Sequence, residues 1–191
     1  MSARPLRRRG CSRPPASRRR PIGTAPAWCR RRRLAGRVAR LLEIGDEAPN
    51  FTLRDQHGQD QSLSARRGDR NVLLVFYPFA FTGVCTGEMK ALQANSWEWE
   101  RAGTDVLAIS CDSVPSLRAF ADQEALAFPL CSDFWPHGTV SATYGAFDDK
   151  LGAAGRATYV IDKQGAIRWT VHTAIADARE IDDYIKALSD V

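Results

Sequence analysis

Asn71-Val-Leu-Leu-Val-Phe-Tyr77 is an almost uninterrupted apolar run that ends at Pro78. An apolar run of this length without alternation is typical of a strand buried on both faces of a sheet. A second such run, Asp105-Val-Leu-Ala-Ile-Ser110, follows a segment over residues 82–101 whose large apolar side chains recur at roughly helical spacing. Two buried strands joined by a helix predict a βαβ unit, with the first run as a central strand.

The segments around this unit complete the predicted fold. Upstream, two short strands at residues 51–53 and 61–63 flank the turn signal His57-Gly58. Downstream we expect a helix over 115–126, a strand at 128–130, a helical turn at 140–144, a hairpin of 157–161 with 166–171, and an amphipathic helix over 177–188. This succession predicts an α/β fold of the thioredoxin-like type, a sandwich in which helices flank a central mixed sheet.

The first forty residues have a different composition from the rest. Residues 1–40 contain 14 arginines and no acidic residue, whereas residues 41–191 carry 13 lysines and arginines against 22 acidic residues. Because large apolar side chains are scarce in residues 1–40, we predict a disordered Arg-rich tail there and one folded domain over 41–191. A nucleic-acid arm, a transit peptide and translated upstream DNA all fit the tail. The last is favoured, with Val38 as an alternative start, because 23 arginines against 4 lysines point to GC-rich codons.

Composition also argues against several classes of function. The acidic body has no electrostatic footprint for nucleic acid, and no stretch reaches the roughly 18–20 apolar residues of a membrane helix. Arginines scattered through the first forty residues disfavour a secretory signal. Five cysteines without CxxC spacing suggest neither a disulfide framework nor a zinc site. We therefore expect reduced thiols and a cytoplasmic protein.

The segment Tyr77-Pro-Phe-Ala-Phe-Thr-Gly-Val-Cys85 lies where the first buried strand passes into its helix, which is where α/β sheets place active sites. Backbone N–H groups are unpaired at a helix N-terminus and the helix dipole is positive there. Both would stabilise a thiolate at Cys85. Cys85 is thus the candidate nucleophile, and the competing interpretation is a buried structural thiol.

Pro78, Thr82 and Cys85 match the Pro-x-x-x-Thr-x-x-Cys active-site motif of the peroxiredoxins, and the chain resembles that family from about Glu43 to its C-terminus. The further segments that resemble the family are Ala48–Leu53, Phe128–Asp133 and Gly155–Asp162. Phe79–Gly83, Ser132–Gly138 and Tyr144-Gly145 are most similar to the one-cysteine alkyl hydroperoxide reductase E subfamily.

The resemblance implies a role for each matching residue. Cys85 would attack the peroxide and become a sulfenic acid, while the Thr82 hydroxyl holds the peroxide and Pro78 shields the thiolate. Arg156 would stabilise both the thiolate and the charge that develops on the leaving oxygen. Glu88 is open to two interpretations: it positions the loop or the arginine side chains, or it is a solvated helix charge. No metal or organic cofactor is implied.

A peroxiredoxin also needs a thiol that returns the sulfenic acid to the reduced state. Position 90 is lysine, which excludes the subtype with both cysteines on one helix, and no cysteine follows Arg156. Cys111 and Cys131 stand at predicted strand ends, where a small core residue and a resolving thiol both remain open. The resemblance implies a one-cysteine enzyme recycled by an external thiol. The reductant is either a low-molecular-weight thiol such as mycothiol, with a glutaredoxin-like protein, or thioredoxin.

Substrate and assembly are less sharply defined. Hydrogen peroxide, organic hydroperoxides and peroxynitrite all stay open as substrates. By analogy with the family we expect a homodimer through an edge near Phe81, Trp135 and Tyr144. Phe79, Phe81 and Trp135 are candidates for an apolar entrance, but each also fits a core or interface position.

Three rival functions compete with the peroxidase. A thiol–disulfide oxidoreductase on the same fold normally uses CxxC, whereas position 88 is glutamate. Nucleic-acid binding through the tail would use its arginines. A catalytically silent structural protein is disfavoured by the complete motif.

Overall fold

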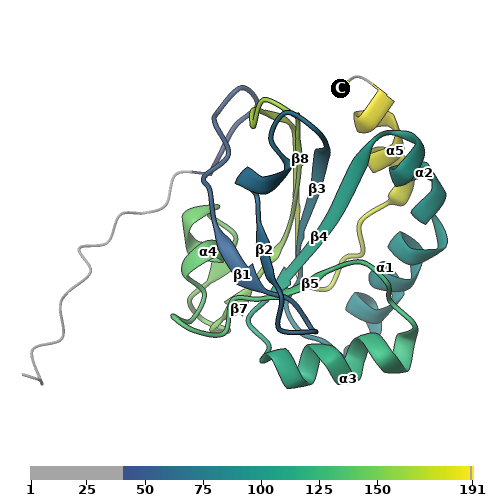
Figure 1. Ribbon diagram of the computed structural model, residues 1–191. Coiled ribbons are helices and arrows are strands. Elements are labelled where there is room, and N and C mark those ends of the chain that lie inside the picture. The colour runs from purple at the N-terminus through teal and green to yellow at the C-terminus, as the bar shows by residue number, and fades with distance from the viewer. Residues whose placement is uncertain (1–40, 190) are drawn as a thin grey trace, which may run out of the picture. The chain divides into compact units, whose positions relative to one another are not determined.

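The computed structural model describes residues 41–189 and 191 of the chain, so the predicted tail over residues 1–40 lies outside the described residues. In the described part, one mixed sheet has the strand order β2-β1-β5-β4-β3-β8-β9 (Figure 1). Its strands are β1 (Thr52–Arg54), β2 (Asp60–Ser62), β3 (Asn71–Phe76), β4 (Thr104–Ser110), β5 (Leu130–Ser132), β8 (Arg156–Ile161) and β9 (Ile167–Thr173). β3 pairs in parallel with β4 and antiparallel with β8, which confirms the predicted thioredoxin-like architecture.

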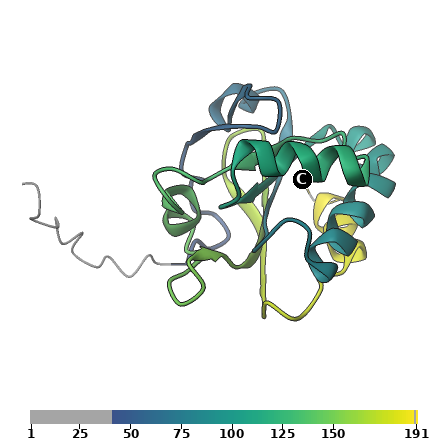
Figure 2. The same ribbon diagram turned by 90° about the horizontal axis from the view of Figure 1, so that it is seen from below.

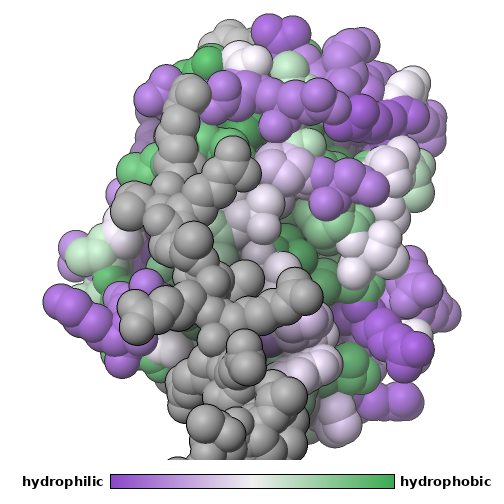
Figure 3. Space-filling view, turned by 90° about the vertical axis from the view of Figure 1, so that its left-hand side faces the viewer, coloured by the Kyte–Doolittle hydropathy of each residue, from purple (hydrophilic) through white to green (hydrophobic). Residues whose placement is uncertain are grey.

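Helices cover both faces of this sheet, as Figure 1 shows. On one face lie α1 (Gly83–Ala94), α2 (Ser96–Arg101), α3 (Val114–Glu124) and α5 (Ile181–Ser189), and on the other lies α4 (Thr139–Thr143). Seen from below, α3 crosses in front of the sheet (Figure 2). The side that carries α4 is drawn in Figure 3, where hydrophilic residues gather at the upper end of the visible surface. The smaller elements are the 3-10 turn η2 (Ser64–Arg66) and the hairpin of β6 (Phe147–Asp148) with β7 (Ala153–Ala154).

Strand β3 is the centre of the core, since all six of its residues are buried. Successive side chains of a strand point to opposite faces, so β3 contributes to two apolar clusters. Leu73 and Val75 pack on the face of α1 and α3, whereas Val72 and Leu74 pack on the other face, with Tyr144. The apolar run in the sequence therefore corresponds to a strand covered on both sides, as predicted.

The predicted helix over residues 82–101 is wrong as one element, because the structure breaks it at Asn95. The Asn95 side-chain amide donates to the carbonyl of Ala91 at 2.8 Å, and its backbone leaves the helical conformation. Asparagine side chains that bond to nearby backbone commonly compete with the helix in this way. Beyond the break, the Trp99 indole donates to the Leu92 carbonyl at 2.9 Å and holds α2 against α1.

Two further elements begin at least two residues later than predicted. The strand predicted at 128–130 is observed as β5 at Leu130–Ser132, after Pro129, which has no N–H to donate and contributes only its carbonyl to Ala108. The last helix begins at Ile181 rather than at residue 177, and in the segment before it the backbone N–H of Arg179 donates to Glu88 at 2.8 Å. No helix in the described residues is long and apolar enough to cross a membrane.

Candidate active site

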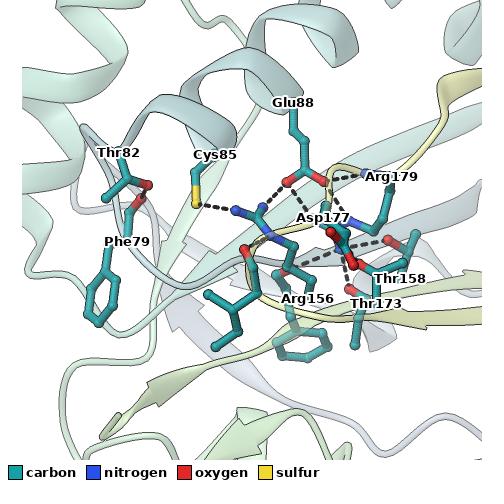
Figure 4. A network of polar contacts seen from close by, with 12 residues as sticks. Phe79, Thr82, Cys85, Glu88, Arg156, Thr158, Thr173, Asp177 and Arg179 are labelled. Carbon is teal, nitrogen blue, oxygen red and sulfur yellow. Dashed lines mark hydrogen bonds and ion pairs between the residues drawn. The ribbon is translucent and has the colours of Figure 1, made fainter.

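Cys85 lies in the first turn of α1, directly after the loop that leaves β3. Its side chain is buried, with only 1% of the residue exposed. The Sγ atom accepts a hydrogen bond from the Arg156 guanidinium, Nη2 to Sγ 3.4 Å (Figure 4). The thiol thus receives a cationic donor from β8 and lies at the positive end of a helix of twelve residues.

Arg156 is the first residue of β8, and its guanidinium is fixed by three different acceptors. Besides Cys85, it donates from Nε to the Ile175 carbonyl at 2.7 Å and forms an ion pair with Glu88. Only 4% of the residue is exposed, so Arg156 is not a surface charge at the edge of the hairpin of β8 and β9. A planar guanidinium with all its edges occupied has little rotational freedom, and its fork is held toward the sulfur.

Glu88 is buried, with 7% exposure, so it is not the solvated helix charge that was one of its two interpretations. Its carboxylate accepts from Arg156 on one side and from Arg179 on the other (Figure 4). Arg179 donates to both Glu88 oxygens at 3.0 Å, from Nε and from Nη2. Glu88 therefore positions arginine side chains, one of which touches the thiol.

Arg179 is the site residue that the sequence analysis missed. It is buried, and its Nη1 also donates to the carbonyls of Phe76 and Ala157 and to the Thr158 hydroxyl, each at 2.9 Å. No sequence signal would single it out, because its main partner is 91 residues away and its chain neighbours read as the start of an amphipathic helix.

The formal charges of this cluster favour an anion at Cys85. Arg156 and Arg179 bring two positive charges and Glu88 one negative charge, so the buried group is net positive. Burial raises the pKa of the neighbouring Tyr184 phenol, which therefore supplies no negative charge at neutral pH. An uncompensated buried charge is costly, and a thiolate would neutralise the cluster.

The loop between β3 and α1 brings the remaining motif residues to the same place. Pro78 is buried and lies two residues after the end of β3. The Thr82 hydroxyl donates to the carbonyl of Phe79 at 3.0 Å (Figure 4), and Thr82 itself is exposed. Cys85, Arg156 and Glu88 thus form one contact network, and Pro78 and Thr82 lie in the loop that leads into the helix of Cys85, while the peroxide-holding role of Thr82 stays a prediction.

The model of the AhpC/TSA family matches residues 44–170 of the chain. The chain is a peroxiredoxin of this family. Alkyl hydroperoxide reductase E from Mycobacterium tuberculosis is 48% identical over 129 residues, 68% of this chain and 84% of that protein. Chloroplastic peroxiredoxin Q from Triticum aestivum is 34% identical over 168 residues, 87% of this chain and 76% of that protein.

A solved structure agrees with this assignment. Peroxidoxin BcpB from Mycobacterium tuberculosis aligns with a TM-score of 0.70 and 29% identity, covering 78% of this chain and 98% of that chain. Like its relatives, this peroxiredoxin is a thiol-dependent peroxidase, and the alternative of a thiol–disulfide oxidoreductase is not favoured.

The other two cysteines that the structure describes in this peroxiredoxin are buried. Cys131 lies within β5 and is fully buried, and Cys111 follows β4 with 8% exposure. Burial raises the pKa of the Cys111 thiol to about 11 and that of Cys131 to about 12. Both are therefore protonated at neutral pH, and the thiolate is the nucleophilic form. Their environment agrees with the interpretation as small core residues.

We expect Arg179→Met to destabilise this peroxiredoxin by about 3–5 kcal/mol, because it removes one partner of a buried ion pair. The free energy of unfolding in urea measures the loss. Arg54→Met is the matched control, since Arg54 pairs with Asp60 at 3.9 Å and the two side chains are 74% and 72% exposed. An exposed pair contributes at most about 1 kcal/mol. Equal losses of unfolding free energy in the two variants would show that the buried Arg179 pair contributes no more to stability than an exposed pair.

The described residues contain no group of three or more histidine, cysteine, aspartate or glutamate side chains that could hold a metal ion.

Proposed function

We propose that Cys85 is the thiol with which this peroxidase attacks its substrate. The Cys85 thiolate attacks one peroxide oxygen, the O–O bond breaks, and the other oxygen leaves as hydroxide or alkoxide, which takes up a proton. The product at the protein is a sulfenic acid. The observation that carries this proposal is the position of the Arg156 guanidinium. It contacts the Cys85 sulfur and also forms an ion pair with Glu88.

The other site residues act around this displacement. Arg156 stabilises the thiolate and the negative charge on the departing oxygen, Thr82 holds the peroxide through its hydroxyl, and Pro78 shields the sulfur from water. Donors already in place before the reaction stabilise the transition state without reorganisation. For Thr82 this requires its hydroxyl to exchange the Phe79 carbonyl for a peroxide oxygen.

The sulfenic acid is then returned to the thiol by external thiols, without a metal or organic cofactor. One thiol condenses with the sulfenic acid to a mixed disulfide and releases water, and a second thiol displaces Cys85 by exchange. The high pKa of the Cys111 and Cys131 thiols supports an external reductant. Mycothiol with a glutaredoxin-like protein and thioredoxin are the two candidate reductants, and three free cysteines among the described residues support a cytoplasmic setting.

We infer that organic hydroperoxides are reduced as well as hydrogen peroxide. Phe79, Phe81 and Val84 surround the start of α1 and are 39%, 50% and 38% exposed. Apolar side chains beside the thiol offer contacts to the alkyl group of an organic peroxide. The name of the relative alkyl hydroperoxide reductase E points the same way.

The function is tested by mixing the reduced protein with peroxide in a stopped-flow instrument while tryptophan fluorescence is recorded. Intact mass should then show a gain of about 16 Da for one sulfenic acid, and peptide mapping should place it on Cys85. An adduct on any other cysteine, or no adduct, would contradict the proposal.

We also propose a homodimer beside the active site, with one correction to the predicted edge. Tyr144 cannot line it, because it is fully buried and its hydroxyl donates to the Pro49 carbonyl at 2.6 Å. Phe81 and Trp135 are 50% and 83% exposed, and such large apolar side chains are typical of interface positions.

Sedimentation at tens of micromolar should therefore show a dimer that Trp135→Glu converts to a monomer, because a charge would be buried at the interface. Trp97→Glu, on α2 and 59% exposed, is the control and should leave the dimer intact. A monomeric wild-type protein would overturn the dimer while leaving the peroxidase untouched.

A further inference from the structure

Asp112 follows β4, and its carboxylate reaches across to the loop that carries the peroxiredoxin motif. The Oδ2 atom accepts a hydrogen bond from the backbone N–H of Ala80 at 2.8 Å and another from the Ser110 hydroxyl at 2.8 Å. Ala80 lies midway between Pro78 and Thr82. One carboxylate oxygen thus connects the end of the neighbouring strand to the middle of the active-site loop.

The main chain of Asp112 is held by hydrogen bonds to two neighbouring strands. Its backbone carbonyl accepts from the Ser132 hydroxyl at 2.6 Å, and its backbone N–H donates to the Ser110 hydroxyl at 3.3 Å. These contacts come from β5 and β4. A half-buried carboxylate with its main chain anchored in this way is a fixed acceptor rather than a mobile surface charge.

The loop that Asp112 holds has a strained backbone. Phe81 has a φ of 63°, in the left-handed region that a bulky side chain rarely occupies. Such a conformation persists only where surrounding contacts hold it in place. The contacts here are the Asp112 bond to Ala80, the edge-on packing of Phe81 against Phe120 at 5.1 Å between ring centroids, and the Thr82 bond to Phe79.

We propose that Asp112 is a positioning residue for peroxide reduction. By accepting the Ala80 N–H it keeps the loop folded so that Pro78 and Thr82 stay beside Cys85. Asp112 itself makes no hydrogen bond to Cys85 or Arg156 in the structure, so it acts through the loop. The proposal rests on the role of Cys85 proposed above.

Asp112 can act through the hydrogen bond that it accepts or through its negative charge. Two substitutions distinguish these possibilities. Asp112→Asn keeps an oxygen that can accept the Ala80 N–H but removes the negative charge. Asp112→Ala removes both. If Asp112 acts by holding the loop, only the alanine variant is slow, whereas a role for its charge would alter both variants.

The test measures the second-order rate of Cys85 oxidation by hydrogen peroxide, followed as modified Cys85 peptide. We expect Asp112→Ala to be about tenfold to a hundredfold slower, as for a buried N–H that is left without an acceptor, and Asp112→Asn to stay close to wild type. Alkylation of Cys85 by iodoacetamide should change little, because that reaction does not need Thr82 and the Arg156 contact remains.

Ser113→Ala is the matched control for a general loss of local stability in the segment after β4. It removes the residue that caps α3, whose side chain accepts from the Ser116 N–H at 3.4 Å, but leaves the Ala80 bond intact. An equally slow control, an equally slow Asp112→Asn, a wild-type rate for Asp112→Ala, or a parallel fall in alkylation would each overturn the proposal. Failure of the proposed function would appear separately, as a wild-type protein whose Cys85 is not oxidised.

Discussion

Cys85→Ser is expected to abolish peroxide reduction, since the hydroxyl of serine is far less acidic and less nucleophilic than a thiol. The loss should reach the detection limit of a coupled peroxidase assay, with hydrogen peroxide and with an organic hydroperoxide alike. The fold should survive, because serine and cysteine differ by one atom and the Glu88 cluster remains in place.

Cys111→Ala and Cys131→Ala are the matched controls, and each should keep the first, peroxide-dependent step. Both thiols are buried and behave as small apolar side chains, so alanine is the mildest replacement. Turnover that stops in one of them with a thioredoxin-type reductant, but continues with a small thiol, would give that cysteine a resolving role. Residual activity in Cys85→Ser would refute the proposed mechanism.

Arg156→Ala is expected to slow the attack on peroxide by about a hundred- to a thousandfold, the usual cost of losing a donor that acts in the transition state. Its guanidinium is the donor that reaches the sulfur, at 3.4 Å, and its charge is permanent. Stopped-flow measurement of the second-order rate constant checks the size of the effect. A titration of the thiolate absorbance shows how much of the rate loss comes from a smaller fraction of Cys85 thiolate before the reaction.

Loss of Arg156 also removes one ion-pair partner of Glu88, so it can lower the stability of the fold. A control must therefore separate an effect on stability from an effect on the rate of peroxide reduction. Arg179→Met removes the other arginine of the same carboxylate but leaves the Arg156 contact to Cys85. It should lose stability with a much smaller loss of rate. Arg156→Lys should remain slow, because one ammonium cannot reach the sulfur, Glu88 and the Ile175 carbonyl together. A rate like that of the wild type in Arg156→Ala would refute the role of this residue.

Local sequence patterns predicted the elements that carry the site. The apolar run of β3, its end at Pro78 and the helix that begins after Thr82 were all expected where they are observed. These features depend on near neighbours in the chain: a strand buried on both faces needs a continuous apolar run, and proline ends it. Cys85 at the start of α1 follows from the same local pattern.

Element boundaries were predicted less well where a side chain competes with the backbone. The helix was not expected to break at Asn95, and the last helix was expected four residues too early. At the first place the Asn95 side-chain amide also bonds the Ala91 carbonyl, and before the second helix the Arg179 N–H bonds the distant Glu88 carboxylate. Periodicity alone cannot detect such partners.

The sequence by itself determined the strands of the sheet and the place of Cys85, and the resemblance of Gly155–Asp162 to the family predicted Arg156 as the partner of Cys85. Only the tertiary structure decided that Glu88 is buried, that Arg179 joins it, and that Tyr144 faces the core. Glu88 contacts Arg156 and Arg179 across 68 and 91 residues of chain. Burial and ion pairing at such separations depend on how strands and helices pack together, and no local propensity or spacing records that packing.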